Sequence, residues 1–239
     1  MQSAGLVQAN VSVLLSKEET PNVRSIRVGK PEGFSFRASQ AVRLTLSGTN
    51  GAVARPFSIA SGPARPYLEF AARRSDSDFK RAFFALRPGD RVGILGPRGD
   101  FFFERNAPGV LVAAGIGITP LKSMLEYATD AALPSRMTLV YGSRHPDEIA
   151  FRHDLEAMAR TNPNIEIVHT VTTSAEGWMG RVGRIDASLL RDASHDLAVY
   201  YLAGPPTMVE HSYQALLSLG VSEQHIRYEV FRGYGGLEE

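Results

Sequence analysis

The sequence predicts two domains of different class: an N-terminal six-stranded antiparallel β-barrel and a C-terminal α/β domain with a five-stranded parallel sheet. Residues 1–105 contain short runs of alternating apolar and polar residues between turn residues, which is typical of antiparallel strands. In residues 106–239, continuous apolar runs alternate with helix-like segments, which indicates a parallel sheet covered on both faces. A chain of 239 residues is long enough for two small domains, each with its own core.

Within residues 1–105, the strand alternation is clearest at Val42-Arg43-Leu44-Thr45-Leu46. Glycine and proline cluster between such runs and mark the turns. We expect strands at residues 11–15, 23–28, 41–46, 57–60, 67–73 and 91–95, and one helix at residues 78–86.

A polar stretch with proline and glycine at residues 105–109 separates the two patterns, and we place the domain boundary there. Beyond it we expect strands at 110–113, 137–141, 165–171, 197–202 and 226–231, and helices at 121–131, 149–160, 187–191 and 207–219. Ligands of open parallel sheets bind at the edge where the strands end, so the loops that follow these strands are candidate site segments.

Composition narrows the classes of function. A net charge of +1 gives no reason to expect nucleic acid as a partner. The longest apolar run, residues 110–121, is interrupted by glycine and proline and is shorter than the roughly 20 residues of a membrane span. Residues 1–10 lack the basic and apolar segments of a secretory signal, so we expect a cytoplasmic protein with no membrane span.

The chain contains no cysteine, which excludes disulfides, thiol catalysis, cysteine-ligated zinc and a cysteine-held iron–sulfur cluster. No close metal-ligand spacing is found among the histidines, and we therefore expect no metal site. The histidines are His145, His153, His169, His195, His211 and His225.

The segment Arg55-Pro56-Phe57-Ser58 brings three useful groups together. A guanidinium binds phosphate bidentately, and an aromatic ring covers a flat ligand. The hydroxyl and backbone N–H of Ser58 suit a ring nitrogen, and Pro56 fixes the backbone between the cation and the ring. A barrel strand that simply ends in an exposed arginine is the alternative interpretation of this segment.

The segment Gly115-Ile116-Gly117-Ile118-Thr119-Pro120 follows an apolar strand and opens a helix. Glycine permits a tight turn, Thr119 suits the helix cap and Pro120 suits the first helical turn. The free N–H groups at such a helix start favour a pyrophosphate. The spacing is not that of the generic dinucleotide fingerprint, and a turn without a ligand is the alternative.

Three further segments are candidates. Gly204-Pro205-Pro206 ends the strand at 197–202, at the same sheet edge as the first glycine turn, so we expect the two turns to define one cleft. At residues 75–80, Ser77 or Asp78 can cap a helix whose N–H groups and lysine suit a second phosphate. The aromatic residues at 228–234 suit a cofactor ring or ordinary core packing.

These motifs, in this order and spacing, resemble those of the ferredoxin–NADP reductase superfamily, and in particular compact bacterial members with only flavin and pyridine-nucleotide domains. The resemblance covers essentially the whole chain. It implies a flavin-dependent oxidoreductase that transfers hydride from NAD(P)H to non-covalent FAD held by the barrel. The electrons then pass to a separate acceptor such as ferredoxin, flavodoxin or an oxygenase component.

The same resemblance implies roles for individual residues. Ser58 would lie near flavin N5 and Glu229 close to the flavin, and these two are the candidate catalytic residues. The candidate cofactor-binding residues are Arg55, Pro56, Phe57, Ser58, Ser77, Phe79, Lys80, Gly115, Gly117, Thr119, Pro120, Ser143, Arg144, Gly204, Pro205, Met208, Phe231 and Tyr234.

Two positions depart from the family pattern. Many members carry tyrosine where this chain has Phe57, and cysteine where it has Ala203. The first change keeps the ring face and loses a hydroxyl contact, and the second excludes a thiol beside the nicotinamide.

The sequence favours NADPH over NADH. The strand at 137–141 leads into Ser143 and Arg144, which suit a 2′-phosphate, with Arg181 as a further candidate cation. Asp147 leaves NADH open, because an acid in this region would bind the ribose hydroxyls.

Two other functions remain open at this point. A free-flavin or ferric reductase of the same fold would use flavin as a substrate. A non-catalytic electron-relay subunit would keep the fold and receive electrons from a partner, although the intact turn at 115–120 argues against it. The basic residues Arg73, Arg74, Lys80, Arg81 and Arg87 suit either an acidic carrier or a solvated face.

Overall fold

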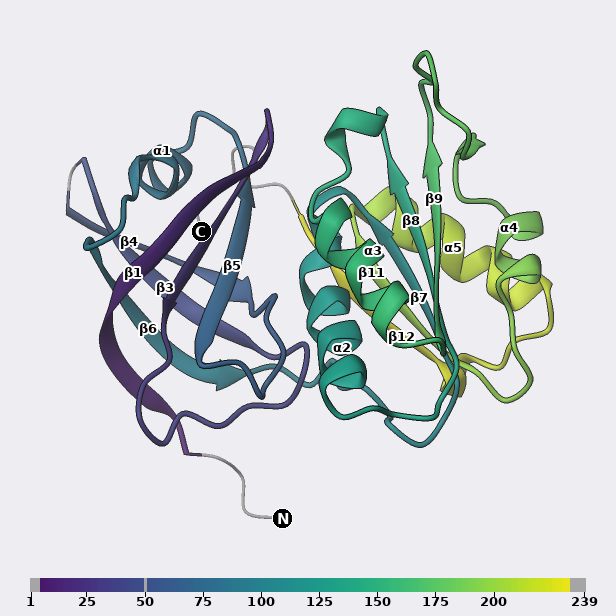
Figure 1. The fold of residues 1–239 in the computed structure, drawn as a ribbon, viewed down its shortest axis with the longest axis horizontal. Helices are drawn as coiled ribbons and strands as arrows, with labels where there is room; N and C mark the ends of the chain where they lie inside the picture. The colour runs from purple at the N-terminus through teal and green to yellow at the C-terminus, as the bar shows by residue number, and fades with distance from the viewer. Residues whose placement is uncertain (1–4, 50, 233–239) are drawn as a thin grey trace.

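Two six-stranded sheets, one antiparallel and one parallel, make up the chain in the computed structural model, which describes residues 5–49 and 51–232 (Figure 1). The expected fold class is confirmed in both halves. Residues 99–108 connect the two sheets: they follow the last antiparallel strand and precede the first parallel strand.

The N-terminal sheet has the strand order β4-β3-β6-β1-β2-β5 and is antiparallel throughout. It rolls into a half-barrel with β4 and β5 at its edges, and a 2.8 Å hydrogen bond from Ala60 N–H to the carbonyl of Glu69 joins the chain after β4 to β5. The strands are β1 (Val7–Thr20), β2 (Val23–Gly29), β3 (Ala41–Gly48), β4 (Gly51–Ser58), β5 (Tyr67–Arg73) and β6 (Arg91–Arg98).

Alternation in β3 places Val42, Leu44 and Leu46 in the barrel core, as predicted. The strand expected at 57–60 is displaced, because β4 begins at Gly51 and ends at Ser58. The first residues of β4 are exposed on a sheet edge, so they carry no apolar alternation that a sequence pattern would detect. Helix α1 (Asp78–Ala85) buries Phe79 and Phe83 against the same core.

The C-terminal sheet is parallel, with the strand order β10-β9-β8-β7-β11-β12. It has six strands and not the expected five, because β10 pairs with Thr170 and Val171 through two residues only, too few for a periodic signal. The strands are β7 (Gly109–Ala114), β8 (Met137–Ser143), β9 (Ile165–Val171), β10 (Arg181–Val182), β11 (Val199–Gly204) and β12 (Ile226–Val230).

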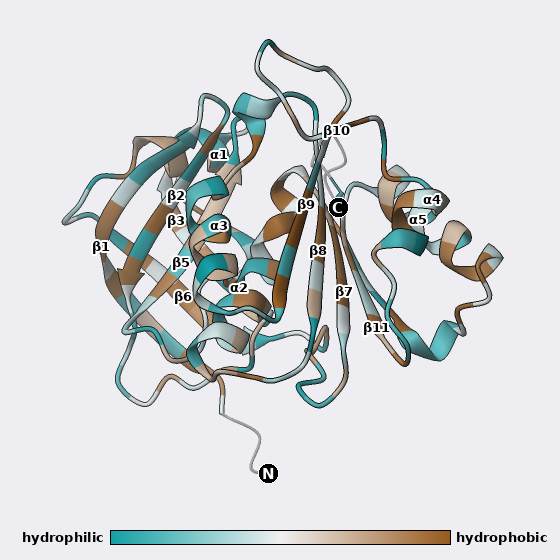
Figure 2. Ribbon diagram, turned by 45° about the vertical axis from the view of Figure 1, so that its right-hand side comes forward, coloured by the Kyte–Doolittle hydropathy of each residue, from teal (hydrophilic) through white to brown (hydrophobic). Residues whose placement is uncertain are grey.

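Helices cover both faces of this sheet, as the continuous apolar strands predict (Figure 2). On one face, α2 (Ile118–Asp130) and α3 (Arg152–Thr161) pack in a core that also includes residues of the half-barrel such as Ala60 and Ala71. On the other face lie α4 (Ala187–Asp192) and α5 (Pro206–Ser218). The described part of the chain contains no helix long and apolar enough to cross a membrane.

Candidate cofactor cleft between the two sheets

A cleft of about 320 Å³ opens where the carboxyl ends of the parallel strands face the half-barrel. Barrel residues, Val23 and Arg73, form one side of it. The strand ends and turns of the parallel sheet form the other: Ala114, Gly115, Ile116, Gly142, Ser143, Arg144, Pro205, Thr207 and Met208. The two glycine turns therefore meet at one cleft, as the sequence predicts.

The two turns touch each other, and their glycines allow this contact. A Cβ on Gly117 would lie 2.1 Å from the carbonyl oxygen of Ala203. Gly204 has a φ of +156°, and a Cβ there would lie 3.1 Å from the carbonyl oxygen of Ala114, which directly precedes the first turn. Side chains at either position would force the turns apart, so glycine keeps the backbone of both close to any ligand in the cleft.

The helix start differs from the prediction in one respect. A 3₁₀ turn at Gly115–Gly117 precedes α2, so the helix begins at Ile118 and its N-cap residue is Gly117, without a side-chain cap. Thr119 is therefore inside the first turn and is not the cap. Its hydroxyl donates to the carbonyl of Ile116 at 3.1 Å, which stabilises the turn, and Pro120 lies in the first helical turn as expected.

Ser58 at the end of β4 and Glu229 on β12 come together across the two sheets. Burial raises the pKa of the Glu229 carboxyl to about 7, with a hydrogen bond from Ser58 acting in the opposite direction. The Oε2 atom of Glu229 is buried and has no hydrogen-bond partner among the described residues. Such an orphaned acceptor indicates a place for a ligand or a proton.

The residues before Ser58 form the barrel side of the site. The Phe57 ring stacks on Phe79 and Phe83, with ring centroids 5.2 and 5.5 Å apart. Because Phe79 is only 2% exposed, it supports Phe57 from behind, which argues against the direct cofactor contact expected of it. Arg55 and Pro56 are exposed beside them.

The start of α1 is capped as expected, since Ser77 Oγ accepts the N–H of Lys80 at 3.3 Å. The Lys80 ammonium lies 5.0 Å from the centroid of the Phe57 ring, and burial lowers its pKa to about 8. A desolvated cation beside a helix start and an exposed arginine suits a phosphate group.

The cleft is also lined by cationic side chains that bear on the choice between NADPH and NADH. Ser143 and Arg144 line it as predicted, and Arg184 lies there too. Arg181 does not line it, because its guanidinium pairs with Asp186 at 3.1 Å. Asp147 is also absent from the lining and pairs with His145 at 3.5 Å.

Sequence reasoning missed several lining residues. Arg73 forms a 2.9 Å ion pair with Glu148 across the cleft, and neither had been assigned to the site. Arg184 follows the strand β10, which is too short to give a periodic pattern in the sequence.

Two of the predicted cofactor-binding residues lie near the C-terminus. Phe231 donates its N–H to the carbonyl of Gly204 at 2.8 Å, and Tyr234 lies outside the described residues.

Known proteins share this sequence pattern. The profile of the oxidoreductase NAD-binding domain family matches residues 111–214. Ferredoxin–NADP reductase B of Sorangium cellulosum is 32% identical over 226 residues, covering 89% of this chain and 93% of that protein. The toluate 1,2-dioxygenase electron transfer component of Pseudomonas putida is 29% identical, covering 96% of this chain and 68% of that protein.

Solved structures share the fold. The Amycolatopsis cytochrome P450 reductase GcoB aligns with a TM-score of 0.84 and 25% identity over 96% of this chain and 71% of that one. A ferredoxin NADP⁺ reductase from Neisseria gonorrhoeae, solved with bound FAD and NADP, aligns with a TM-score of 0.79 and 24% identity over 93% of this chain and 98% of that one.

Proposed function

Since this chain belongs to the ferredoxin–NADP reductase family, we propose that it transfers hydride from NADPH to FAD and passes the electrons to a separate carrier such as ferredoxin. It is an NAD(P)H-dependent flavoprotein oxidoreductase. The observation that carries the proposal is the meeting of Ser58 and Glu229, which pairs with Ala203 next to the second glycine turn, while both glycine turns border one cleft.

The residues present fit FAD on the barrel side. FAD, when bound, supplies an acceptor for two electrons, while the protein supplies binding, orientation and electrostatics. Arg55 and the desolvated Lys80 suit its phosphates, and the supported ring of Phe57 suits a flat ring system. The orphaned Oε2 of Glu229, which lies beside Ser58, suits a polar group of the bound flavin.

Glu229 and Ser58 suit proton handling. With a pKa of about 7, the Glu229 carboxyl is close to half protonated at neutral pH. It can hold a proton at its buried oxygen and exchange it through the Ser58 hydroxyl, so that the local charge stays balanced when electrons arrive and leave.

The nucleotide side uses the parallel sheet. The turn at 115–117 and the start of α2 present N–H groups to a pyrophosphate, and Gly204 lets the nicotinamide approach the backbone of β11. Arg144 and Arg184 both line the cleft and suit a 2′-phosphate, which supports NADPH over NADH.

The acceptor is proposed from the relatives. They include a ferredoxin–NADP reductase and the electron transfer component of a dioxygenase, so ferredoxin, flavodoxin or an oxygenase component is expected here. Because its proposed donor is a soluble nicotinamide nucleotide, we place the reaction in the cytoplasm.

The test is the visible spectrum of the purified protein during anaerobic titration with NADPH and then NADH. We expect bands of oxidised flavin that NADPH bleaches at lower concentration than NADH. A colourless preparation that reduces added flavin would favour the free-flavin or ferric reductase. A coloured protein that neither nucleotide bleaches would contradict the proposal and favour the relay subunit.

A further inference from the structure

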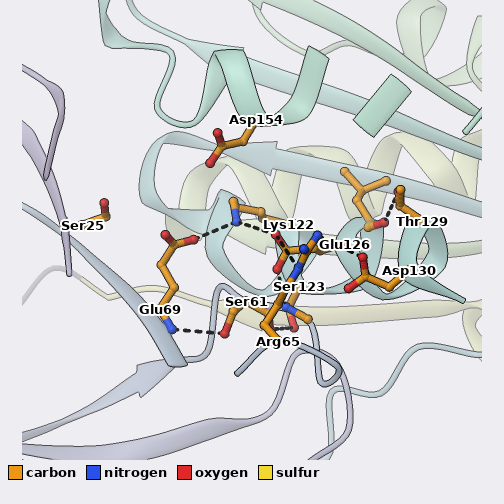
Figure 3. Close-up of polar contacts among 12 residues, drawn as sticks. Ser25, Ser61, Arg65, Glu69, Lys122, Ser123, Glu126, Thr129, Asp130 and Asp154 are labelled. Atoms are coloured by element: carbon orange, nitrogen blue, oxygen red, sulfur yellow. Dashed lines mark hydrogen bonds and ion pairs between the residues drawn. The ribbon is translucent and has the colours of Figure 1, made fainter. Parts of the chain in front are cut away.

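Six charged side chains from both halves of the chain form an ion network around the contact between β5 and α2. We call this set the interdomain ion network. It contains three cations and three carboxylates, so its formal charge is balanced. Its members are Arg27, Arg65, Glu69, Lys122, Glu126 and Asp130. Figure 3 shows Arg65, Glu69, Lys122, Glu126 and Asp130.

Lys122 lies at the centre of the network, and its side chain is fully buried. Its Nζ atom lies 2.7 Å from Glu69 Oε2 on β5 and 3.4 Å from Glu126 Oε1 one turn later on α2. Arg27 binds the other oxygen of Glu69 at 2.7 Å, and the Phe151 ring lies 5.1 Å from the ammonium. The lysine therefore has fixed partners on two elements of different domains.

Glu69 and Lys122 stay charged inside the protein. Burial opposes the charge on Glu69, but Lys122 and Arg27 lower its pKa below the ordinary value. Burial likewise opposes the charge on Lys122, but Glu69 and Glu126 raise its pKa. A buried ion pair of this kind contributes little net stability compared with apolar residues of the same volume. The ion pair does fix the distance between the two elements that carry it, because buried opposite charges are stable only at a short separation.

The network acts on both sides of the cleft. Helix α2, which carries Lys122, begins directly after the glycine turn at 115–117. The neighbouring Ser123 donates to the carbonyl of Ser61 at 2.7 Å, and Ser61 lies three residues beyond Ser58. Glu126 accepts the N–H of Gly62 in the same loop. The helix that follows the glycine turn is thus bound to β5 and to the loop that leaves β4 directly after Ser58.

We propose that Lys122 is a positioning residue for hydride transfer: through Glu69 and Glu126 it sets the distance between the glycine turn and Ser58. This inference rests on the proposed function, since it concerns how the nicotinamide meets the flavin. A displacement of about 1 Å between reacting groups lowers a rate by up to about 100-fold. A network that fixes two elements at 2.7 Å contacts has the precision that this requires.

The test compares wild type with the double variant Glu69→Gln/Lys122→Met, which removes both charges and keeps the volumes. We expect the rate of flavin reduction at saturating NADPH to fall about 10- to 100-fold, with the dissociation constant for NADPH changed less than about threefold. The long-wavelength charge-transfer band of the reduced flavin with nicotinamide should weaken as well. Arg136→Gln is the matched control, because it removes an exposed ion pair with Glu166 and should leave both readouts unchanged.

A readout without cofactor is hydrogen–deuterium exchange of the peptide 59–66, which should be faster in the double variant. A double variant that is folded and flavin-loaded, yet has the wild-type rate and band, would overturn the inference. If it does not fold, Ser123→Ala breaks two hydrogen bonds across the same interface, the one that Ser123 donates to the Ser61 carbonyl and the one that it accepts from the Ser39 N–H. This variant should slow reduction by about threefold, and an unchanged rate would again overturn the inference. A wild type that NADPH does not bleach would instead refute the proposed function.

Discussion

At the scale of single residues, Glu229 has a folded-state pKa of about 7 against an ordinary value of 4.5. The folded protein therefore binds this proton more tightly than the unfolded chain does, and wild-type stability should fall as pH rises from about 4.5 to 7. Glu229→Gln cannot lose that proton, so at pH 8 the variant should be more stable than wild type by on the order of 2 kcal/mol.

Urea unfolding of the cofactor-free protein at pH 5 and pH 8 measures this difference. The difference should be much smaller at pH 5 than at pH 8, because pH 5 lies close to the ordinary pKa at which the carboxyl of the unfolded chain titrates. Glu176→Gln, which changes an exposed carboxyl, is the control and should have the stability of wild type at both pH values. Equal pH dependence in wild type and Glu229→Gln would show that the carboxyl is not held in its protonated form.

Arg144 and Arg184 are expected to select NADPH by binding its 2′-phosphate. Removal of a charge-assisted contact of this kind lowers the affinity for the ligand by about 10- to 100-fold. Arg144→Ala and Arg184→Ala should each raise the KM for NADPH by roughly that factor and leave the KM for NADH nearly unchanged. Steady-state kinetics with both nucleotides measures it, with Arg181→Ala as the control outside the cleft lining. Equal losses with both nucleotides would contradict the assignment.

At the scale of elements, the turn between β7 and α2 depends on Gly117. An added Cβ would meet the Ala203 carbonyl at 2.1 Å, so either the turn or β11 must shift. Gly117→Ala should lower the free energy of unfolding by about 1–3 kcal/mol, as overpacking does, and weaken nucleotide binding. Gly29→Ala is the control, since nothing lies within 4 Å of a Cβ there. Wild-type nucleotide affinity in Gly117→Ala would separate this turn from the binding site.

Helix α1 depends on its cap. Ser77 satisfies the N–H of Lys80, and its removal leaves that donor without a side-chain partner. Ser77→Ala should cost about 1 kcal/mol in the free energy of unfolding measured by urea. Ser188→Ala changes an exposed serine in α4 and should cost less than about 0.5 kcal/mol. Equal costs for the two would mean that the cap does not stabilise α1.

At the scale of the whole molecule, one core spans both sheets, so we expect a single cooperative unfolding transition. Phe103 lies in the connecting segment, 7% exposed, and its ring centroid is 5.8 Å from that of Tyr201. Phe103→Ala should lower the free energy of unfolding by about 3–5 kcal/mol. The half-buried neighbour Phe102 is the control, and Phe102→Ala should cost much less. Two separate transitions in wild type would contradict the shared core.

The local features of this protein were predictable from its sequence. Alternation predicted β3, continuous apolar runs predicted the parallel strands, and Ser77 was one of the two cap candidates, with Asp78, for α1. Features without local periodicity were not predicted. They are the exposed first residues of β4, the two-residue strand β10 and the 3₁₀ turn that places Thr119 inside the helix. The motif residues around both glycine turns were also identified, because tight turns require particular residue types.

By itself, then, the sequence determined the two fold classes, the order of their elements and the edge at which a ligand must bind, since these depend on residues close together in the chain. Only the tertiary structure decided that Ser58 meets Glu229, that Arg184 and not Arg181 reaches the cleft, and that a helical lysine such as Lys122 is buried between two carboxylates. These contacts join segments far apart in sequence. Their partners depend on how one sheet packs against the other, which no local pattern records.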